Sequence, residues 1–183
     1  IIAKADGSIR SLADLRDHLI AFEDPGSTTG FLVPLAMLRG RGIPTEELSG
    51  PRQTPTKGSA GYLFTRAELN VAAMVARGLA QAGAINDVDW NDEKRTPPSL
   101  KKDLVVLETS EPLLRSILLV RGNLAPALKD AIRDTLLQAH QDPEGKDTLA
   151  TYFKVSRYDE LAPLAKALDQ GRKLYALVRD RMQ

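Results

Sequence analysis

The 183-residue sequence contains no cysteine and only two histidines, and aromatic residues make up 5% of it. The absence of cysteine excludes disulfide bonds, thiol catalysis and cysteine-ligated metal sites. It does not decide the compartment, because periplasmic and cytosolic chains can both lack cysteine. His18 and His140 lie far apart in the sequence and have no neighbours that complete a metal site, so we expect surface roles for both.

A block of basic residues and a long apolar run are also absent. The 25 basic and 24 acidic residues give a formal charge of +1, and with so few aromatics no nucleic-acid-binding surface is indicated. The longest apolar runs, residues 31–38 and 116–120, fall well short of the roughly 20 residues that a membrane-spanning helix needs. Any preference for an anion must therefore come from a local site.

The most informative segment is residues 24–30, Asp-Pro-Gly-Ser-Thr-Thr-Gly. It follows the short apolar run 19–22, and a helical pattern begins at Phe31, so it predicts a tight turn between a strand and a helix. The first turn of a helix has amide N–H groups without intrahelical partners and carries partial positive charge, so it can bind an oxyanion. The same residues are also ordinary for a helix N-cap, and the local pattern leaves both interpretations open.

The remaining pattern predicts an α/β chain that ends in helices. We expect strands at residues 1–4, 19–23, 82–85, 104–107 and 117–120, and helices at 11–16, 28–39, 66–78, 126–140, 147–153 and 158–182, the last interrupted at Gly171. Residues 44–59 are rich in Pro, Gly, Ser, Thr and Lys and predict a surface loop, with a short strand inside it left open because no apolar pattern locates one. Residues 86–90 follow an expected strand and so fall at the edge where open parallel sheets bind ligands.

Several short sequence motifs occur in a recognisable order: residues 8–15 (Ser-Ile-Arg-Ser-Leu-Ala-Asp-Leu), residues 20–31, Arg77-Gly78, Ala82-Gly83-Ala84 and residues 120–124. The order resembles the phosphate, phosphite and phosphonate substrate-binding subunits of ABC transporters, which have the type II periplasmic binding protein fold. The resemblance extends over nearly the whole chain. The helix at 11–16 and the Ser-Thr-Thr-Gly turn occur together at the expected spacing, and this combination is more specific for the family than either motif alone.

The resemblance implies an α/β fold of two lobes, joined by crossing strands, that close on a ligand. Residues 1–8 would then form a strand of the first lobe and the hinge, residues 9–106 the second α/β lobe, and residues 107–183 the return through the hinge to the first lobe, with C-terminal helices. The sequence opens on Ile-Ile-Ala-Lys, without a Met or a signal-peptide pattern. We therefore expect the N-terminal part of the first lobe, and part of the ligand site, to lie upstream.

The resemblance also implies site residues. Ser27, Thr28 and Thr29 would hold the oxyanion through hydroxyl groups and backbone amides, and Gly30 would allow its close approach. Two positions depart from the family, because Glu68 stands where many relatives have His and Gln81 stands where they have Asp. These departures leave the ligand specificity open.

Acidic residues at 86–89 bear on the nature of the ligand. Asn86, Asp87 and Asp89 suit relatives that bind an aminoalkyl phosphonate, since an ammonium group needs an acidic partner and a bare dianion is repelled by one. A protonated oxyanion can instead donate a hydrogen bond to a carboxylate, so phosphate and phosphite stay compatible. A solvated loop or a helix cap is the alternative for both aspartates. We expect Glu68 to complement a helix dipole and Trp90 to pack within a lobe.

The implied function is that of the periplasmic solute-binding component of an ABC transporter for phosphonate, phosphite or phosphate. Its partners would be a small oxyanion ligand and a membrane permease, with no cofactor and no metal, and its location the periplasm or, through a lipid anchor, the cell surface. The alternative is the extracellular ligand-sensing domain of a signalling receptor with the same fold. Catalysis is not expected, because the sequence shows no nucleophile–base pair, metal cluster or His beside the turn.

Overall fold

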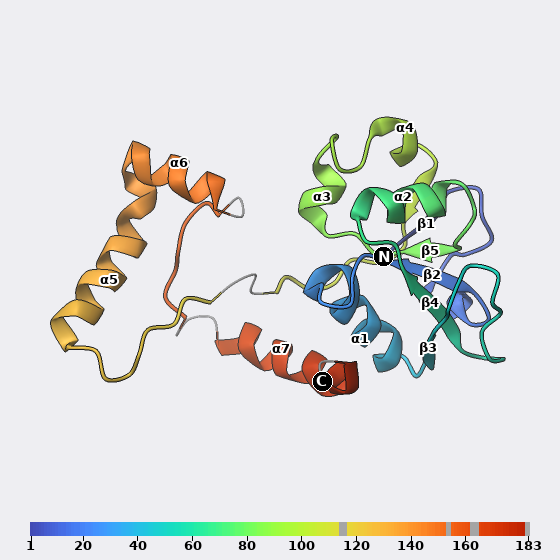
Figure 1. Ribbon diagram of the computed structural model, residues 1–183, viewed down its shortest axis with the longest axis horizontal. Helices are drawn as coiled ribbons and strands as arrows, with labels where there is room; N and C mark the ends of the chain where they lie inside the picture. Colours follow the sequence, from blue (N-terminus) through green and yellow to red (C-terminus); the bar gives the residue numbers. More distant parts are fainter. Residues whose placement is uncertain (114–116, 153–154, 162–164, 182–183) are drawn as a thin grey trace. The chain divides into compact units, whose positions relative to one another are not determined.

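The structure is a computed structural model that describes residues 1–113, 117–152, 155–161 and 165–181. The chain divides into two compact units. Unit 1 comprises Ile1–Glu111 and Arg172–Gln183, and unit 2 comprises Pro112–Gly171. Figure 1 labels the elements of both units. The expected lobe boundaries at residues 8 and 106 stay a prediction.

Unit 1 is built on a six-stranded sheet with strand order β3-β4-β2-β5-β1-β6. The strands are β1 (Ile2–Lys4), β2 (Leu19–Phe22), β3 (Thr45–Glu47), β4 (Ala60–Phe64), β5 (Ala82–Gly83) and β6 (Leu104–Val106). Strands β3, β4, β2 and β5 run parallel, whereas β1 pairs antiparallel with β5 and with β6. The carboxyl ends of β4, β2 and β5 therefore meet at one edge of the sheet.

Helices cover both faces of this sheet, which explains why β2 is apolar at every position. Ile20 and Phe22 belong to the core that includes α1 (Val33–Gly40). Leu19 and Ala21 belong to the core that includes α2 (Glu68–Ala76). Figure 1 shows α1 and α2 on opposite sides of the strands. The two cores keep the central strands away from water and fix the edge at which they end.

An aromatic cluster in the α1 core anchors the start of the helical segment that follows β2. Phe31 lies next to Phe22 and Phe64, with ring centroids 5.2 and 4.8 Å apart, in edge-to-face geometry. Tyr62 completes the cluster, with its centroid 5.4 Å from that of Phe31. Because Phe31 directly follows Gly30, its burial holds the first turn of the helix against the sheet.

The other helical segments of unit 1 are the 3₁₀ helix η1 (Leu12–Leu15), the π-helical turn η2 (Thr28–Leu32), α3 (Asp87–Asn91) and α4 (Pro98–Lys101). Unit 2 contains α5 (Pro126–Gln138), the 3₁₀ turn η3 (Ala139–Gln141) and α6 (Pro143–Thr151). Helix α7 (Ala165–Val178) begins in unit 2, ends in unit 1 and is followed by the 3₁₀ turn η5 (Arg179–Arg181). None of the helices in the described parts of the chain has the length and apolar character of a bilayer crossing.

The expected strand at 117–120 is wrong. These residues are in no regular element, and Leu119 is 84% exposed. An apolar run becomes a strand only where a neighbouring strand accepts its hydrogen bonds, and no strand among the described residues pairs with this segment.

Strand β4 was not among the expected strands. Its residues show no polar–apolar alternation, and the pairing with β2 that makes them a strand is distant in sequence.

The C-terminal helix also differs from expectation. Residues 158–161 are not helical, α7 starts at Ala165, and it continues through Gly171 without a break. One glycine costs a helix only about 1 kcal/mol, so an otherwise good helical sequence tolerates it. Strand β5 is shorter than the expected 82–85. The ends of the expected helices at 147–153 and 158–182 fall outside the described residues.

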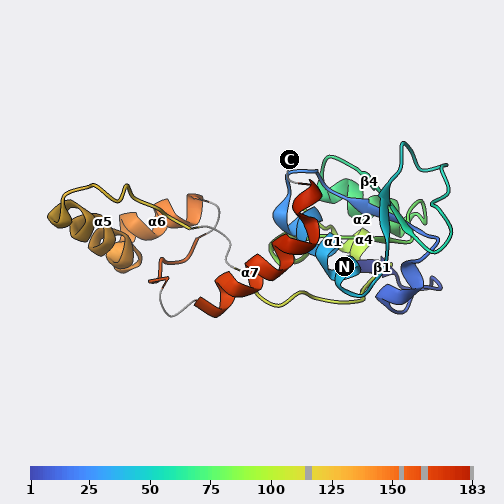
Figure 2. The ribbon, with the colours of Figure 1, turned by 90° about the horizontal axis from the view of Figure 1, so that it is seen from below.

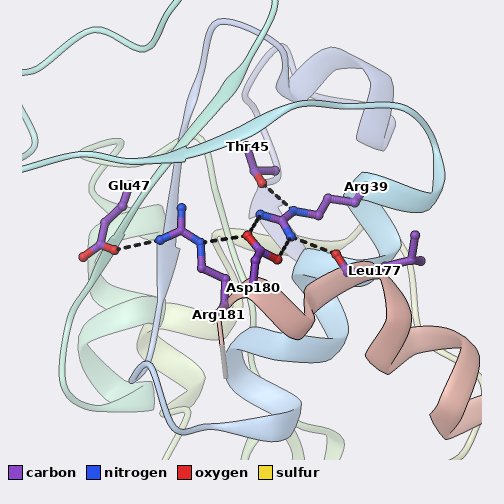
Figure 3. Close-up of polar contacts among 6 residues, drawn as sticks. All are labelled: Arg39, Thr45, Glu47, Leu177, Asp180 and Arg181. Carbon is purple, nitrogen blue, oxygen red and sulfur yellow. Dashed lines mark hydrogen bonds and ion pairs between the residues drawn. The ribbon is translucent and has the colours of Figure 1, made fainter. Parts of the chain in front are cut away.

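The end of α7 lies against α1 in unit 1 (Figure 2). Arg39, in the last turn of α1, donates to the Leu177 carbonyl over 2.8 Å and to the two carboxylate oxygens of Asp180 over 2.6 and 3.2 Å. Its Nε donates to Thr45 Oγ1 over 3.1 Å (Figure 3). The hydrogen bond from Arg39 holds the pKa of the Asp180 carboxyl below its ordinary value. We call Arg39, Thr45, Leu177, Asp180 and Arg181 the C-terminal polar cluster.

Apolar contacts accompany this cluster. Val178 is 2% exposed and belongs to the α1 core. Arg181 lies 3.7 Å from Glu47 and has its guanidinium 5.8 Å from the centroid of the Tyr62 ring. Burial raises the pKa of the Tyr62 hydroxyl, for which the described residues provide no hydrogen-bond partner. The C-terminal segment is therefore an integral part of unit 1.

Candidate functional site

The turn at residues 24–30 leaves the carboxyl end of β2 and opens the helical segment formed by η2 and α1. Asp24 sets the turn, because its Oδ1 accepts from the Gly26 N–H over 2.9 Å and its carbonyl accepts from the Ser27 N–H over 3.0 Å. Ser27 is the N-cap, and its Oγ accepts from the Gly30 N–H over 3.0 Å. The N-cap expected from the sequence is confirmed.

The first amides of the helical segment are unoccupied donors. The segment begins with π-type spacing, in which the Leu32 N–H donates to the Ser27 carbonyl over 3.0 Å and the Val33 N–H donates to Thr28. Thr28 and Thr29 are exposed, and no described residue accepts a hydrogen bond from either backbone N–H. Two amides and two hydroxyl groups thus stand at the positive end of a helix.

Gly30 is required by the packing behind this turn. A Cβ atom at this position would lie 2.7 Å from Glu23 Oε2 and 2.8 Å from Ser27 Oγ. The carboxylate of Glu23 therefore sits directly beside the first turn. Glu23 was not among the expected site residues, although its place immediately after β2, at the carboxyl end of a parallel strand, could have indicated it.

Three carboxyl groups meet at this edge of the sheet. Phe22 of β2 pairs with Phe64 of β4, and the Arg66 N–H donates to the Glu23 carbonyl over 2.8 Å, so the start of α2 lies beside Glu23. Glu68 lies in the first turn of α2, and hydrogen bonding with the side chains of Glu23 and Asp89 contributes to its raised pKa. We call Glu23, Glu68 and Asp89 the carboxyl cluster.

The environment of Glu68 disfavours its charged form. Partial burial raises the pKa of Glu68 to about 7, and hydrogen bonding with Glu23 and Asp89 and the negative charge of Glu23 act in the same direction. Glu68 was expected only to complement the dipole of α2. The structure places it instead beside two further acids, next to the candidate anion-binding turn.

Two of the three expected ligand residues at 86–89 form hydrogen bonds with each other. Asn86 is the N-cap of α3, because its Oδ1 accepts from the Asp89 N–H over 2.9 Å and its Nδ2 donates to Asp89 Oδ2 over 2.5 Å. Asp89 also lies 4.0 Å from Arg95. The Asp87 side chain is exposed, and its backbone carbonyl accepts from Asn91 Nδ2 over 2.8 Å. A ligand role for the three residues stays a prediction.

The two departures from the family have different consequences. Gln81 Oε1 accepts from the Leu19 N–H over 3.1 Å, at the starts of β5 and β2. Gln81 therefore lies at the edge opposite the turn and supports the sheet. Glu68 lies at the same edge as the turn, so this departure is the one that bears on the ligand.

Other candidate residues have structural surroundings. Trp90 packs against the α2 core, as expected, and Lys101 Nζ lies 4.6 Å from its ring centroid. His18 and His140 have intermediate exposure. Among the described residues, no group of three or more His, Asp and Glu side chains is arranged to hold a metal ion.

A separate pocket of about 600 Å³ opens between α2 and the loop after β3. Leu63, Arg66, Met74 and Arg77 are among its lining residues. None of the turn residues 27–30 lines this pocket.

Comparison with known proteins decides the family. Residues 1–165 match the family described as "ABC transporter, phosphonate, periplasmic substrate-binding protein". The chain belongs to this family. The resemblance noted in the sequence and the α/β fold class that it implied are both confirmed.

Solved structures agree with this assignment. XAC2383 from Xanthomonas citri matches in its chloride-bound form with 35% identity and a TM-score of 0.87, over 99% of this chain and 64% of that chain. The ATP-bound form matches with 34% identity and a TM-score of 0.89, over 100% and 66%. This chain therefore spans about two thirds of the length of that relative.

A more distant relative shares the fold. PhnD1 from Prochlorococcus marinus, solved in complex with methylphosphonate, has 16% identity and a TM-score of 0.63, over 97% of this chain and 65% of that chain. At this identity the likeness supports the fold alone.

Proposed function

We propose that this chain belongs to a periplasmic binding protein that holds a small oxyanion at the turn formed by Ser27, Thr28, Thr29 and Gly30 and delivers it to a membrane permease. The ligand class is phosphonate, phosphite or phosphate. The observation that carries the proposal is the pair of exposed, unoccupied amide donors at Thr28 and Thr29, at the N-terminus of a helix, in a chain of a phosphonate-binding family.

The chemistry of the turn fits such a ligand. Ser27 Oγ already accepts a hydrogen bond from the Gly30 amide, so its own O–H is free to donate to an oxyanion. The hydroxyl groups of Thr28 and Thr29 add two donors, and the helix dipole adds partial positive charge. Hydrogen bonds to a charged acceptor are worth more than those between neutral groups. Methylphosphonate, chloride and ATP, which the solved relatives bind, are all anionic or carry ionised oxygens.

The proposal is tested by calorimetry on the full-length protein with phosphate, phosphite, methylphosphonate, 2-aminoethylphosphonate and ATP. We expect binding of one ligand molecule per protein for at least one of the oxyanions. Absence of binding heat and of thermal stabilisation with all five contradicts the proposal. Ligand-dependent uptake by vesicles that contain the permease distinguishes transport from the sensing alternative, which would use the same site.

Thr28→Ala tests the turn itself. It removes one hydroxyl donor and should weaken ligand binding by about 1.5–3 kcal/mol, the usual range for a hydrogen bond to a charged group. Folding stability should hardly change, because Thr28 is exposed. The control is Thr54→Ala, on the exposed loop after β3. Equal affinities of the two variants and the wild type would mean that the turn serves only as a helix cap.

A further inference from the structure

The pocket between α2 and the loop after β3 lies apart from the proposed oxyanion turn. Its volume of about 600 Å³ falls within the range of roughly 300–1,000 Å³ that is usual for small-molecule sites. All of its lining residues belong to unit 1, and neither the turn nor the C-terminal polar cluster contributes one. We call this pocket the α2 groove.

Hydrogen bonds fix both walls of the α2 groove. On the loop side, the Leu48 N–H donates to the Tyr62 carbonyl over 2.8 Å, and the N–H and Oγ of Ser49 donate to Gln53 Oε1 over 2.8 and 2.9 Å. On the helix side, Asn70 Nδ2 donates to the Thr65 carbonyl over 2.8 Å. A ligand would therefore meet walls that are already ordered, which lowers the entropic cost of binding.

The α2 groove contains apolar surface. Leu63 and Met74 are only partly buried against the α2 core, and Leu79 is 56% exposed. A hydrocarbon chain laid over these three side chains would remove apolar surface from water. A single exposed leucine is ordinary on a protein surface, so the charges of the groove must decide which ligand fits.

The charges favour an anion. Arg66 and Arg77 flank α2, and the described residues provide no hydrogen bond or ion pair for the Arg77 side chain. Arg66 pairs with Asp24 over 3.5 Å, but the two side chains are 74% and 49% exposed, so this pair is weak. Glu47 also lines the groove, and it lies 3.7 Å from Arg181. Arg77 is thus the cation that is free to bind a carboxylate or another acid group.

Arg66 occupies an uncommon backbone conformation at the rim of the groove. Its φ of 71° lies in the left-handed region, which costs energy for a residue other than glycine. The Arg66 N–H donates to the Glu23 carbonyl and the Thr65 N–H to the Phe22 carbonyl, each over 2.8 Å, and these bonds hold the conformation. The chain therefore has a second cation beside the groove at a position where glycine would suit the backbone better.

We propose that the α2 groove is a second binding site, for a small organic acid with an apolar chain. The acid group pairs with Arg77, and the chain covers Leu63, Met74 and Leu79. Both parts must belong to one molecule, because an exposed ion pair alone is weak and each CH₂ group that is buried adds affinity. This site goes beyond the proposed function and does not require a ligand at the turn.

The test adds octanoate, 1-octanol and acetate separately to the full-length protein at about pH 7, where both acids are ionised, and maps the response of backbone amides by NMR. Octanoate carries the acid and the chain, 1-octanol only the chain, and acetate only the acid. We expect octanoate at millimolar concentration to shift the amide signals of residues 48–50 and 73–77. The response to 1-octanol should be weaker, and acetate should leave these signals unchanged.

Arg77→Gln removes the charge and keeps most of the length of the side chain. It should weaken octanoate binding about threefold, which is the size expected of an exposed ion pair, and leave 1-octanol binding unchanged. The matched control is Lys102→Gln, which removes the same charge from an exposed residue outside the groove and should bind octanoate as the wild type does. Leu79→Ala should weaken the binding of both octanoate and 1-octanol.

The inference is overturned if octanoate does not shift the groove signals, if its shifts are confined to Thr28 and Thr29, or if Arg77→Gln and Lys102→Gln bind it equally. The proposed function stands in each of these cases. Conversely, octanoate binding in the groove without a response to any oxyanion contradicts the proposed function alone. If Arg77→Gln fails to fold, the comparison of octanoate with 1-octanol and acetate on the wild type decides, and equal responses to octanoate and 1-octanol refute the role of the charge.

Discussion

Replacement of Arg39 by Ala is the sharpest test of how unit 1 is held together, because it needs no ligand. The change removes the hydrogen bonds to Leu177 O, Thr45 Oγ1 and both carboxylate oxygens of Asp180. The bonds to Leu177 and Asp180 connect the end of α1 with the end of α7 and with η5, and Arg39 and Asp180 are 141 residues apart in sequence. We expect the C-terminal segment to loosen while the sheet stays folded.

The magnitude follows from the exposure of the groups. The Arg39 side chain is 20% exposed and that of Asp180 is 59% exposed, so the ion pair contributes at most about 1 kcal/mol. The bonds to Leu177 O and Thr45 Oγ1 add about 1 kcal/mol each. The arginine side chain loses conformational entropy worth about 1–2 kcal/mol when it is ordered, and its removal offsets the loss of bonds by that amount. The net loss of unfolding free energy should be about 1–2 kcal/mol.

Urea unfolding followed by circular dichroism measures this loss, and amide hydrogen exchange locates it. Exchange should accelerate at residues 174–181 and stay unchanged in β2 and β4. The control is Arg52→Ala, an exposed arginine for which the described residues provide no hydrogen bond or ion pair. A stability equal to that of the wild type, or unchanged exchange at the C-terminus, would refute the assigned role of the C-terminal polar cluster.

Three further predictions concern the candidate site. Ser27→Ala should lower the free energy of unfolding by about 1 kcal/mol through loss of the N-cap, and a urea midpoint equal to that of the wild type contradicts the cap. Ser27→Asp should keep the stability but abolish oxyanion binding. Gly30→Ala should displace the Glu23 carboxylate and cost about 1–3 kcal/mol, and an unchanged melting temperature argues against the close packing. Without ligand, the free energy of unfolding should fall as pH rises from about 4.5 to about 7, because Glu68 ionises at lower pH in the unfolded chain than in the folded protein. After allowance for solvent screening, the loss should be about 1 kcal/mol. Glu68→Gln should remove this pH dependence.

Local interactions made part of the structure predictable from sequence. A helix was expected at residues 11–16, and the Ser11 N–H donates to Asp14 over 2.8 Å at the beginning of η1. The apolar run at 19–22 followed by Asp24 and Ser27 predicted a strand, a turn and an N-cap. All of these features depend on residues within a few positions of one another, so a single sequence contains the necessary information.

Features that depend on distant pairing could not be predicted in the same way. Strand β4 owes its existence to β2 and β3, and its residues show no alternation that would indicate a strand. Residues 117–120 are as apolar as β2, yet among the described strands they have no partner. An apolar run indicates only that burial of the segment is favourable, and it does not indicate whether the segment pairs as a strand.

The carboxyl cluster shows the same limit within the site. Glu23, Glu68 and Asp89 follow three different strands, and only the sheet register brings them together. From the sequence, Asp89 was expected at a ligand-binding edge and Glu68 was expected to complement a helix dipole, but nothing in the sequence indicated that the two would influence each other. Position after a parallel strand was the available indication for Glu23.

Helix α1 is fastened at both ends before any ligand arrives. Phe31 is buried among aromatic rings at its entrance, and Arg39 joins the C-terminal polar cluster at its exit. The conformational entropy of ordering this segment is therefore lost during folding and not during binding. A preorganised turn of this kind retains more of its interaction energy as affinity, because the donors need not be immobilised by the oxyanion itself.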